Sequence, residues 1–344
     1  MIKYLDQVSA LTNAGSLLSA DDRIVASYDL EVDGVPAEGY RSLTSDPAIR
    51  NANAAPFEID YARVARLHVI NGMGVTLGDS IIGLTALAAI KRAHPGISIS
   101  LYRPRKAPDY VRQLYELAQP VIGQTIDLPV PAASIPVDEL RIDIGNHLFW
   151  PNFSLMPMID FFFWSLGVSP DQLDHNAMSN DWLKGVALPS LGEDLQAGKY
   201  VLFCPVASTP VRSIPQPLHA ELVERMWRKF QLPVLGFGRV EHRHYTDITH
   251  RSPDTAAFLA WVKGARFLVT SDTAAVHIAA GFDVPTTSFF TTIPAKMRVR
   301  DYPRCIPVDL PLPALAGIQA SGREADLQMV EDAYRAFLDT GWEM

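Results

Sequence analysis

Short apolar segments alternate with longer segments of helical spacing in two separate stretches of this 344-residue chain. In the first stretch, residues 67–70 are a predicted strand and residues 79–94 the helix after it. In the second, the strand covers residues 200–205 and the helix 218–230. Strands that alternate with helices are typical of a parallel sheet covered on both faces. The sequence therefore predicts an α/β fold with two doubly wound, Rossmann-like domains in tandem.

We expect four parts along the chain. Residues 1–60 are a separate, partly β N-terminal extension, in which 23–32 read as strand and Asp33-Gly34 as a hairpin turn. The two Rossmann-like domains cover 61–190 and 199–318, and a cleft is expected between their strand carboxyl ends. A helix within 319–344 is expected to pack back on the first domain, and 148–168 is expected to form one helix.

Charge and composition exclude several classes of protein. The net charge of −8 argues against general nucleic-acid binding. Residues 61–120, with 8 basic against 3 acidic side chains, could face an anionic acceptor or a membrane surface; a solvated face is the alternative. Prolines and Asp160 interrupt the apolar stretch 148–168, so no spanning helix is expected. Two distant cysteines and no visible secretory signal favour the cytoplasm.

A glycine-rich turn precedes the first long helix. The spacing Gly72-x-Gly74-x-x-x-Gly78 differs by one residue from a dinucleotide fingerprint, so it predicts no nicotinamide site. Asp79 follows at the helix start. Its carboxylate could cap the helix, or it could take a proton from an acceptor hydroxyl. The spacing alone leaves both interpretations open.

A second strand runs into a helix at residues 271–277. Ser271 or Asp272 could cap that helix, and small residues after Thr273 leave its first N–H groups open to a diphosphate. His277 lies one turn further on, where packing is the alternative to ligand contact. In the loop 207–215, Arg212 could hold a phosphate or lie on a solvated surface. His242-x-His244 has no third ligand at suitable spacing, so we predict no metal site and no bound cofactor.

Four motifs in the same order resemble the heptosyltransferase family, glycosyltransferase family nine. Thr76-Leu-Gly-Asp79 is similar to the family's Gly-Asp helix start, and Ser208-Thr-Pro-Val-Arg212-Ser-Ile-Pro to its Ser-x-x-Lys-x-Trp-Pro loop. Gly236-Phe-Gly-Arg-Val-Glu241 resembles its Gly-Gly-x-x-Glu turn. Asp272-Thr273-Ala274-Ala-Val-His277 resembles its Asp-Thr-Gly-x-x-His signature. The resemblance covers about residues 66–305.

The resemblance implies a GT-B architecture and an inverting, metal-independent sugar transfer from a nucleotide-diphosphate donor, typically ADP-heptose. By position, Asp79 would be the general base and Arg212 would replace the phosphate-binding lysine. Glu241 would bind the ribose. The remaining donor-binding positions would be Ser208, Thr209, Asp272, Thr273, Ala274 and His277, with Ala274 in place of the signature glycine.

The implied partners are a nucleotide-sugar and a glycan, lipopolysaccharide-type or protein acceptor. Two alternatives stay open. One is a GT-B-like nucleotide-sugar epimerase, which needs no acceptor. The other is a non-catalytic protein that binds a nucleotide-sugar or a partner.

Overall fold

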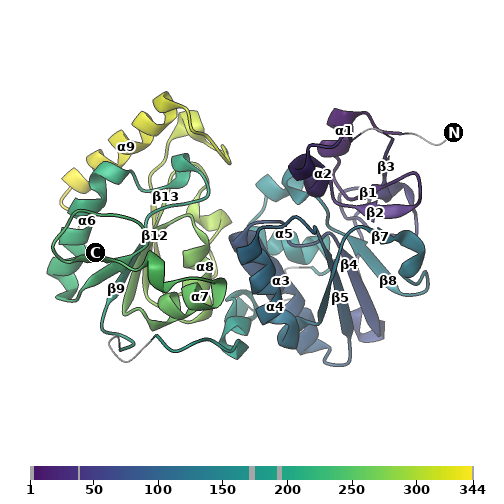
Figure 1. The fold of residues 1–344 in the computed structure, drawn as a ribbon, viewed down its shortest axis with the longest axis horizontal. Helices are drawn as coiled ribbons and strands as arrows, with labels where there is room; N and C mark the ends of the chain where they lie inside the picture. The colour runs from purple at the N-terminus through teal and green to yellow at the C-terminus, as the bar shows by residue number, and fades with distance from the viewer. Residues whose placement is uncertain (1–3, 38, 170–174, 192–195, 343–344) are drawn as a thin grey trace. The chain divides into compact units, whose positions relative to one another are not determined.

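The computed structural model describes residues 4–37, 39–169, 175–191 and 196–342. The chain divides into two compact units, Met1–Met178 and Ser179–Met344. Each unit is built on its own parallel sheet (Figure 1). The prediction of two Rossmann-like α/β units is confirmed.

The first unit contains a four-stranded parallel sheet in the order β6-β5-β4-β8. Its elements are β4 (Arg66–Ile70), α3 (Leu77–Ala93), β5 (Ser98–Arg103), α4 (Asp109–Ile122), β6 (Gln124–Asp127), β8 (Leu140–Asp143) and α5 (Met158–Ser165). Helix α3 is buried along most of its length because its middle is almost wholly apolar, and it packs against α4 and α5. Its N-terminus lies at the carboxyl edge of the sheet.

Residues 1–60 belong to this first unit rather than forming a separate arm. They supply α1 (Gln7–Leu11), β1 (Leu17–Leu18), β2 (Arg23–Val25), α2 (Ser27–Asp33) and β3 (Arg41–Ser42). The three strands form an antiparallel sheet with β7 (Val130–Pro131). Leu18 and Ile24 of this small sheet share an apolar cluster with Ile70 and Tyr102 of the parallel sheet. The extension therefore covers part of the sheet of the first unit.

The second unit contains six parallel strands in the order β11-β10-β9-β12-β13-β14. They are β9 (Val201–Cys204), β10 (Val234–Gly236), β11 (Tyr245–Asp247), β12 (Phe267–Ser271), β13 (Thr286–Phe290) and β14 (Cys305–Asp309). Helices α6 (His219–Phe230) and α9 (Glu324–Asp339) share one apolar core with the sheet. Helices α7 (Thr255–Gly264) and α8 (Ala274–Gly281) pack together on the other side (Figure 1).

Three local predictions differ from the structure. Only residues 23–25 of the predicted strand 23–32 are extended; Ser27–Asp33 is helical, and Gly34 ends that helix with a φ of 62°. The segment 148–168 forms two short 3₁₀ turns before α5, because Pro151 and Pro157 each begin a new turn. Helix α9, expected to pack back on the first domain, belongs to the second unit and packs Val330, Tyr334 and Leu338 into that unit's core.

No membrane-spanning segment is found among the helices that the structure describes, since none of them is both long and apolar enough to cross a bilayer.

Candidate functional site

Two arginines meet one carboxylate where β12 ends and α8 begins. Nη1 of Arg212 lies 2.9 Å from Oδ2 of Asp272, and Nε of Arg298 lies 3.7 Å from the same oxygen. All three side chains are largely buried. These three side chains are hereafter the arginine–aspartate cluster. A pair of guanidiniums at one place is a group that can bind an anionic ligand.

The charge state of Asp272 follows from its neighbours. Burial on its own raises the pKa of the Asp272 carboxyl, but Arg298 and Arg212 outweigh burial and hold that pKa below its ordinary value. Asp272 is therefore a carboxylate at neutral pH. The arginines in turn have a fixed counter-charge while no ligand is bound.

Thr273 caps helix α8 beside this cluster. Its hydroxyl accepts a hydrogen bond from the Ala275 N–H at 3.1 Å and shares another with the Thr270 hydroxyl at 2.8 Å. The expectation that Ser271 or Asp272 caps this helix is wrong, since Asp272 instead points to the arginines. Ala274 is the first helical residue and is partly exposed. The positive end of the helix dipole adds to the positive charge of the arginines.

The loop after β9 positions Arg212. Nη2 of Arg212 donates to the Ser208 hydroxyl at 2.9 Å. Nε of Arg212 is buried and has no hydrogen-bond partner among the described residues. The Thr209 hydroxyl bonds to the backbone of Ser321, which ties this loop to the segment before α9. Ser208 thus contacts the cluster through Arg212, whereas the Thr209 hydroxyl holds the loop against the segment before α9.

His277 is buried and bonded within the second unit. Its Nδ1 lies 2.9 Å from the Tyr302 hydroxyl, and its carbonyl oxygen accepts a hydrogen bond from Nδ2 of Asn180. These contacts favour the packing interpretation over direct ligand contact.

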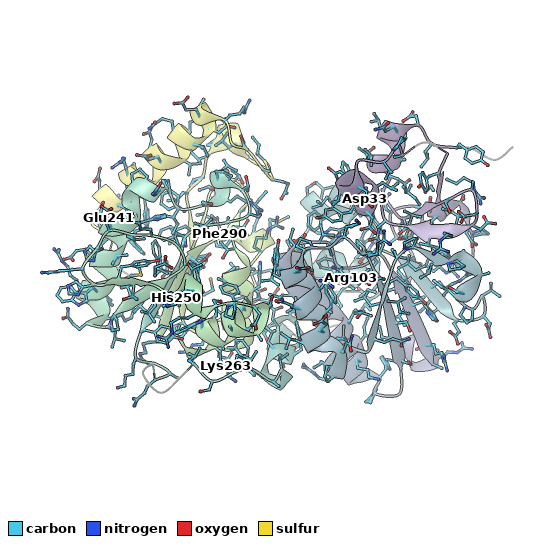
Figure 2. The ribbon with its side chains drawn as sticks, in the orientation of Figure 1. Asp33, Arg103, Glu241, His250, Lys263 and Phe290 are labelled. Atoms are coloured by element: carbon cyan, nitrogen blue, oxygen red, sulfur yellow. The ribbon has the colours of Figure 1, made fainter. Side chains whose placement is uncertain are left out.

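Glu241 lies in the loop after β10 (Figure 2). Its side chain is 80% exposed and pairs with Arg239 at 2.6 Å. It lines a cavity of about 490 Å³ together with the start of α6. The structure brings Ser208, Arg212 and Asp272 together and places Glu241 at this cavity, which shares Pro217, His219 and Val240 with the larger cavity described next.

A larger cavity of about 640 Å³ opens beside the loop that carries Arg212. Its walls come from the loops after β9 and β10 and from the first turns of α9, and include Ile214, Phe237 and Leu327. Ala207, Pro210 and Ser213 line it as well, so it reaches the loop that carries Arg212, although Arg212, Asp272 and Arg298 are not among its lining residues. Its size and largely apolar walls are those of a small-molecule site.

In the first unit, Asp79 lies in the first turn of α3. Thr76 is the helix cap and accepts a hydrogen bond from the Asp79 N–H at 3.4 Å, so the capping interpretation of Asp79 is wrong. The Asp79 side chain is 14% exposed, and its Oδ2 lies 3.5 Å from Nε2 of His147.

Arg103, at the end of β5, holds the glycine-rich turn ahead of Asp79 (Figure 2). Its Nη1 donates to the Gly72 carbonyl, and its guanidinium lies 3.8 Å from the centre of the Tyr115 ring. A buried cation thus fixes the backbone that leads into α3.

Sequence reasoning missed Arg298, His147 and Arg103. Arg298 lies in the segment after β13, at the carboxyl edge of the parallel sheet, and this position was the available signal. His147 follows the strand 140–143, as expected of a residue at the carboxyl edge of a parallel sheet. An arginine and a histidine are not unusual at these positions, so Arg298 and His147 could be identified only from their contacts in the structure.

Among the described residues, no group of three or more His, Cys, Asp or Glu side chains could hold a metal ion. His242 instead bonds to Glu224, and His244 stacks on Trp227 with ring centres 3.8 Å apart.

No protein-family model and no curated protein matches this sequence. Solved structures with a similar fold include a glycosyltransferase family 9 protein from Veillonella parvula, at 15% identity and a TM-score of 0.49, covering 74% of this chain and 87% of that one. E. coli heptosyltransferase WaaC with ADP shows 14% identity and a TM-score of 0.43, covering 80% and 100%. E. coli ADP-heptose lps heptosyltransferase II shows 13% identity and a TM-score of 0.45, covering 80% and 99%.

Proposed function

We propose that this chain is an inverting, metal-independent glycosyltransferase. It moves a sugar from a nucleotide-diphosphate donor to a hydroxyl of a glycan or protein. The sequence motifs favour heptose, supplied as ADP-heptose, as the sugar that is transferred. The observation that supports this function is the arginine–aspartate cluster at the start of α8.

The second unit has the features that a nucleotide-diphosphate donor requires. Arg212, Arg298 and the N-terminus of α8 offer positive charge to the diphosphate. The cavity of about 640 Å³ beside the loop that carries Arg212 has room for the nucleoside. Asp272 is then available to orient sugar hydroxyls as the arginines turn toward phosphate.

The same groups can assist departure of the diphosphate. Negative charge grows on the leaving phosphate oxygen as the bond to the anomeric carbon breaks, and fixed cations lower the energy of that state. Because both guanidiniums are already held in place before the reaction, they need to move little as the bond breaks. This is the part of catalysis that we assign to Arg212 and Arg298.

Asp79 takes the acceptor's proton in this scheme. The acceptor oxygen attacks the anomeric carbon from the face opposite the diphosphate, so one displacement inverts the configuration. The proton of the hydroxyl passes to Asp79 while the oxygen–carbon bond forms. Asp79 lies in the first turn of α3 with its side chain 14% exposed, and this position supports the role.

Calorimetric titration of ADP and AMP tests the donor site. We expect ADP to bind more tightly than AMP, and Arg212→Ala and Arg298→Ala each to weaken ADP binding by about 2–3 kcal/mol while changing AMP binding little. Arg228→Ala, at an exposed position on α6, is the control. Equal binding of ADP and AMP, or variants that bind ADP like the wild type, would contradict the site.

Turnover separates transfer from the other functions. With ADP-heptose and a lipopolysaccharide-type acceptor we expect ADP release that a chelator leaves intact and Asp79→Asn abolishes. Conversion of the donor sugar without any acceptor would favour an epimerase. Donor binding without turnover would favour a binding protein.

A further inference from the structure

His147 faces the carboxylate that we propose as the base. Its Nε2 lies 3.5 Å from Oδ2 of Asp79. The close approach depends on Gly74, because a Cβ at that glycine would lie 2.7 Å from Cε1 of His147 and 3.2 Å from Oδ2 of Asp79. The backbone of the glycine-rich turn thus leaves space for this pair.

The imidazole of His147 is held in place by aromatic rings. Its ring centre lies 4.7 Å from that of Phe153, 5.8 Å from Phe161 and 5.4 Å from Phe162. The residue is 2% exposed. Its Nε2 is buried and has no hydrogen-bond partner within the described ranges, so the Asp79 carboxylate is the polar group that it faces. A buried polar atom in such a position is costly unless it gains a partner.

The N-terminal extension braces the loop that carries His147. Asp143 accepts hydrogen bonds from the Ser16 N–H at 2.8 Å, the Ser16 hydroxyl at 2.7 Å and the Gly145 N–H at 2.9 Å. Nδ2 of Asn146 donates to the carbonyl oxygens of Leu11 and Asn13, each at 2.9 Å. Residues 11–16 therefore fix the backbone on both sides of Gly145 and up to His147.

We propose that His147 is a positioning residue for Asp79, and that residues 11–16 hold it there; both rest on the proposed function of Asp79. With its proton on Nε2, the imidazole donates to Oδ2 as the carboxylate turns toward the acceptor. Oδ1 is then directed to the acceptor hydroxyl. The proton moves from that hydroxyl to Oδ1, the new oxygen–carbon bond forms, and the diphosphate leaves with the electron pair of its bond to the sugar. His147 neither gains nor loses a proton in this step.

Substitution of His147 tests this role through the kinetic constants. We expect His147→Leu to lower kcat for ADP release from ADP-heptose, with a lipopolysaccharide-type acceptor, by about tenfold or more, without changing the KM for the donor. His147→Gln keeps an N–H donor near the same place and should retain most of kcat. His250→Gln, at an exposed position in the second unit, is the control (Figure 2). Wild-type kcat in His147→Leu, or equal losses in both variants, would overturn the role.

A second measurement does not depend on the substrates or on the folding of the His147 variants. In the 15N-labelled protein, Asp79→Asn should move the imidazole Nε2 resonance of His147 and leave that of His250 in place. An unmoved His147 resonance would overturn the pairing. The proposed function fails separately, if Asp79→Asn turns over donor like the wild type.

Substitution of Asn146 tests whether residues 11–16 hold His147 in place. Asn146 has a φ of 53°, so Asn146→Gly keeps this backbone conformation while removing the bonds to Leu11 and Asn13. We expect kcat to fall in the same direction as in His147→Leu, by a smaller factor, with donor KM unchanged. An unchanged kcat would show that residues 11–16 do not position His147.

Discussion

Ser16 and Asp143 lie 127 positions apart in the sequence, yet both the N–H and the hydroxyl of Ser16 donate to the Asp143 carboxylate. Both residues are fully buried. The contact joins the N-terminal extension to the carboxyl end of β8, where His147 follows. It explains why an acidic, partly β extension is part of the first unit.

Removal of the Ser16 hydroxyl should therefore destabilise the protein. A hydrogen bond to a buried carboxylate contributes about 1.5–3 kcal/mol, so we expect Ser16→Ala to lower the free energy of unfolding by about 2 kcal/mol. Urea unfolding followed by circular dichroism measures this change. Ser45→Ala, whose hydroxyl is exposed and bonds to the nearby Ser42 carbonyl, should stay within about 0.5 kcal/mol of the wild type. Equal stability of both variants would contradict the brace.

Asp272→Asn should have opposite effects on stability and on anion binding. Loss of the carboxylate removes the negative charge that Asp272 places against two buried guanidiniums, so we expect a loss of about 3 kcal/mol in buffer. ADP supplies the missing negative charge, and its addition should raise the melting temperature of this variant more than that of the wild type. Asp283→Asn, an exposed position in the same unit, is the control. A smaller ADP-induced shift in Asp272→Asn would count against the diphosphate site.

The same carboxylate gives a pH dependence. The pKa of Asp272 is lower in the folded than in the unfolded chain, so the unfolded chain takes up the proton first as the pH falls. The stabilisation that ionised Asp272 gives to the folded chain is complete at pH values above the ordinary pKa of aspartate. It is lost as the pH falls through the lower pKa that Asp272 has in the folded chain. In acid titrations of unfolding, the Asp272→Asn variant should accordingly show a shallower loss of stability than the wild type below about pH 4.

Both α/β units were predictable from sequence because their strands and helices carry local signals. The apolar strands and the Pro95-Gly96 stop are short-range signals, whereas the start of the helix at Leu77, capped by Thr76, lies two residues before the predicted start at Asp79. The helix Ser27–Asp33 was misread as strand because apolar residues alternate there by chance, and the left-handed Gly34 suited either a turn or a helix end.

The candidate site was predictable in part. Motif order located Arg212 and Asp272, and the structure pairs them. Arg298 and His147 could be identified only from their tertiary contacts, because the neighbouring sequence does not indicate which residues they approach in the folded chain. The role of residues 1–60 also depended on long-range bonds, such as those of Ser16 and Asn146.

The two cysteines should resist thiol reagents in the folded protein. Burial raises the pKa of Cys305 to about 12 and raises that of Cys204 as well. The thiolate is the reactive form, so little of it exists at mildly alkaline pH. We expect slow labelling by a disulfide reagent in buffer and rapid labelling of both thiols in guanidinium chloride. Rapid labelling of the native protein would show that Cys305 is more accessible than the structure indicates.

Gly74→Ala should disturb the Asp79–His147 pair without affecting donor binding. Gly74 has a φ of 68°, and the added methyl group would press on both side chains. We expect a loss of about 1–2 kcal/mol in stability from the left-handed backbone and a clear fall in kcat, whereas ADP affinity, which we assign to the second unit, stays unchanged. Gly96→Ala is the matched control, since its Cβ would meet open space and its φ is ordinary. Wild-type turnover in Gly74→Ala would mean that the spacing between Asp79 and His147 does not matter for the reaction.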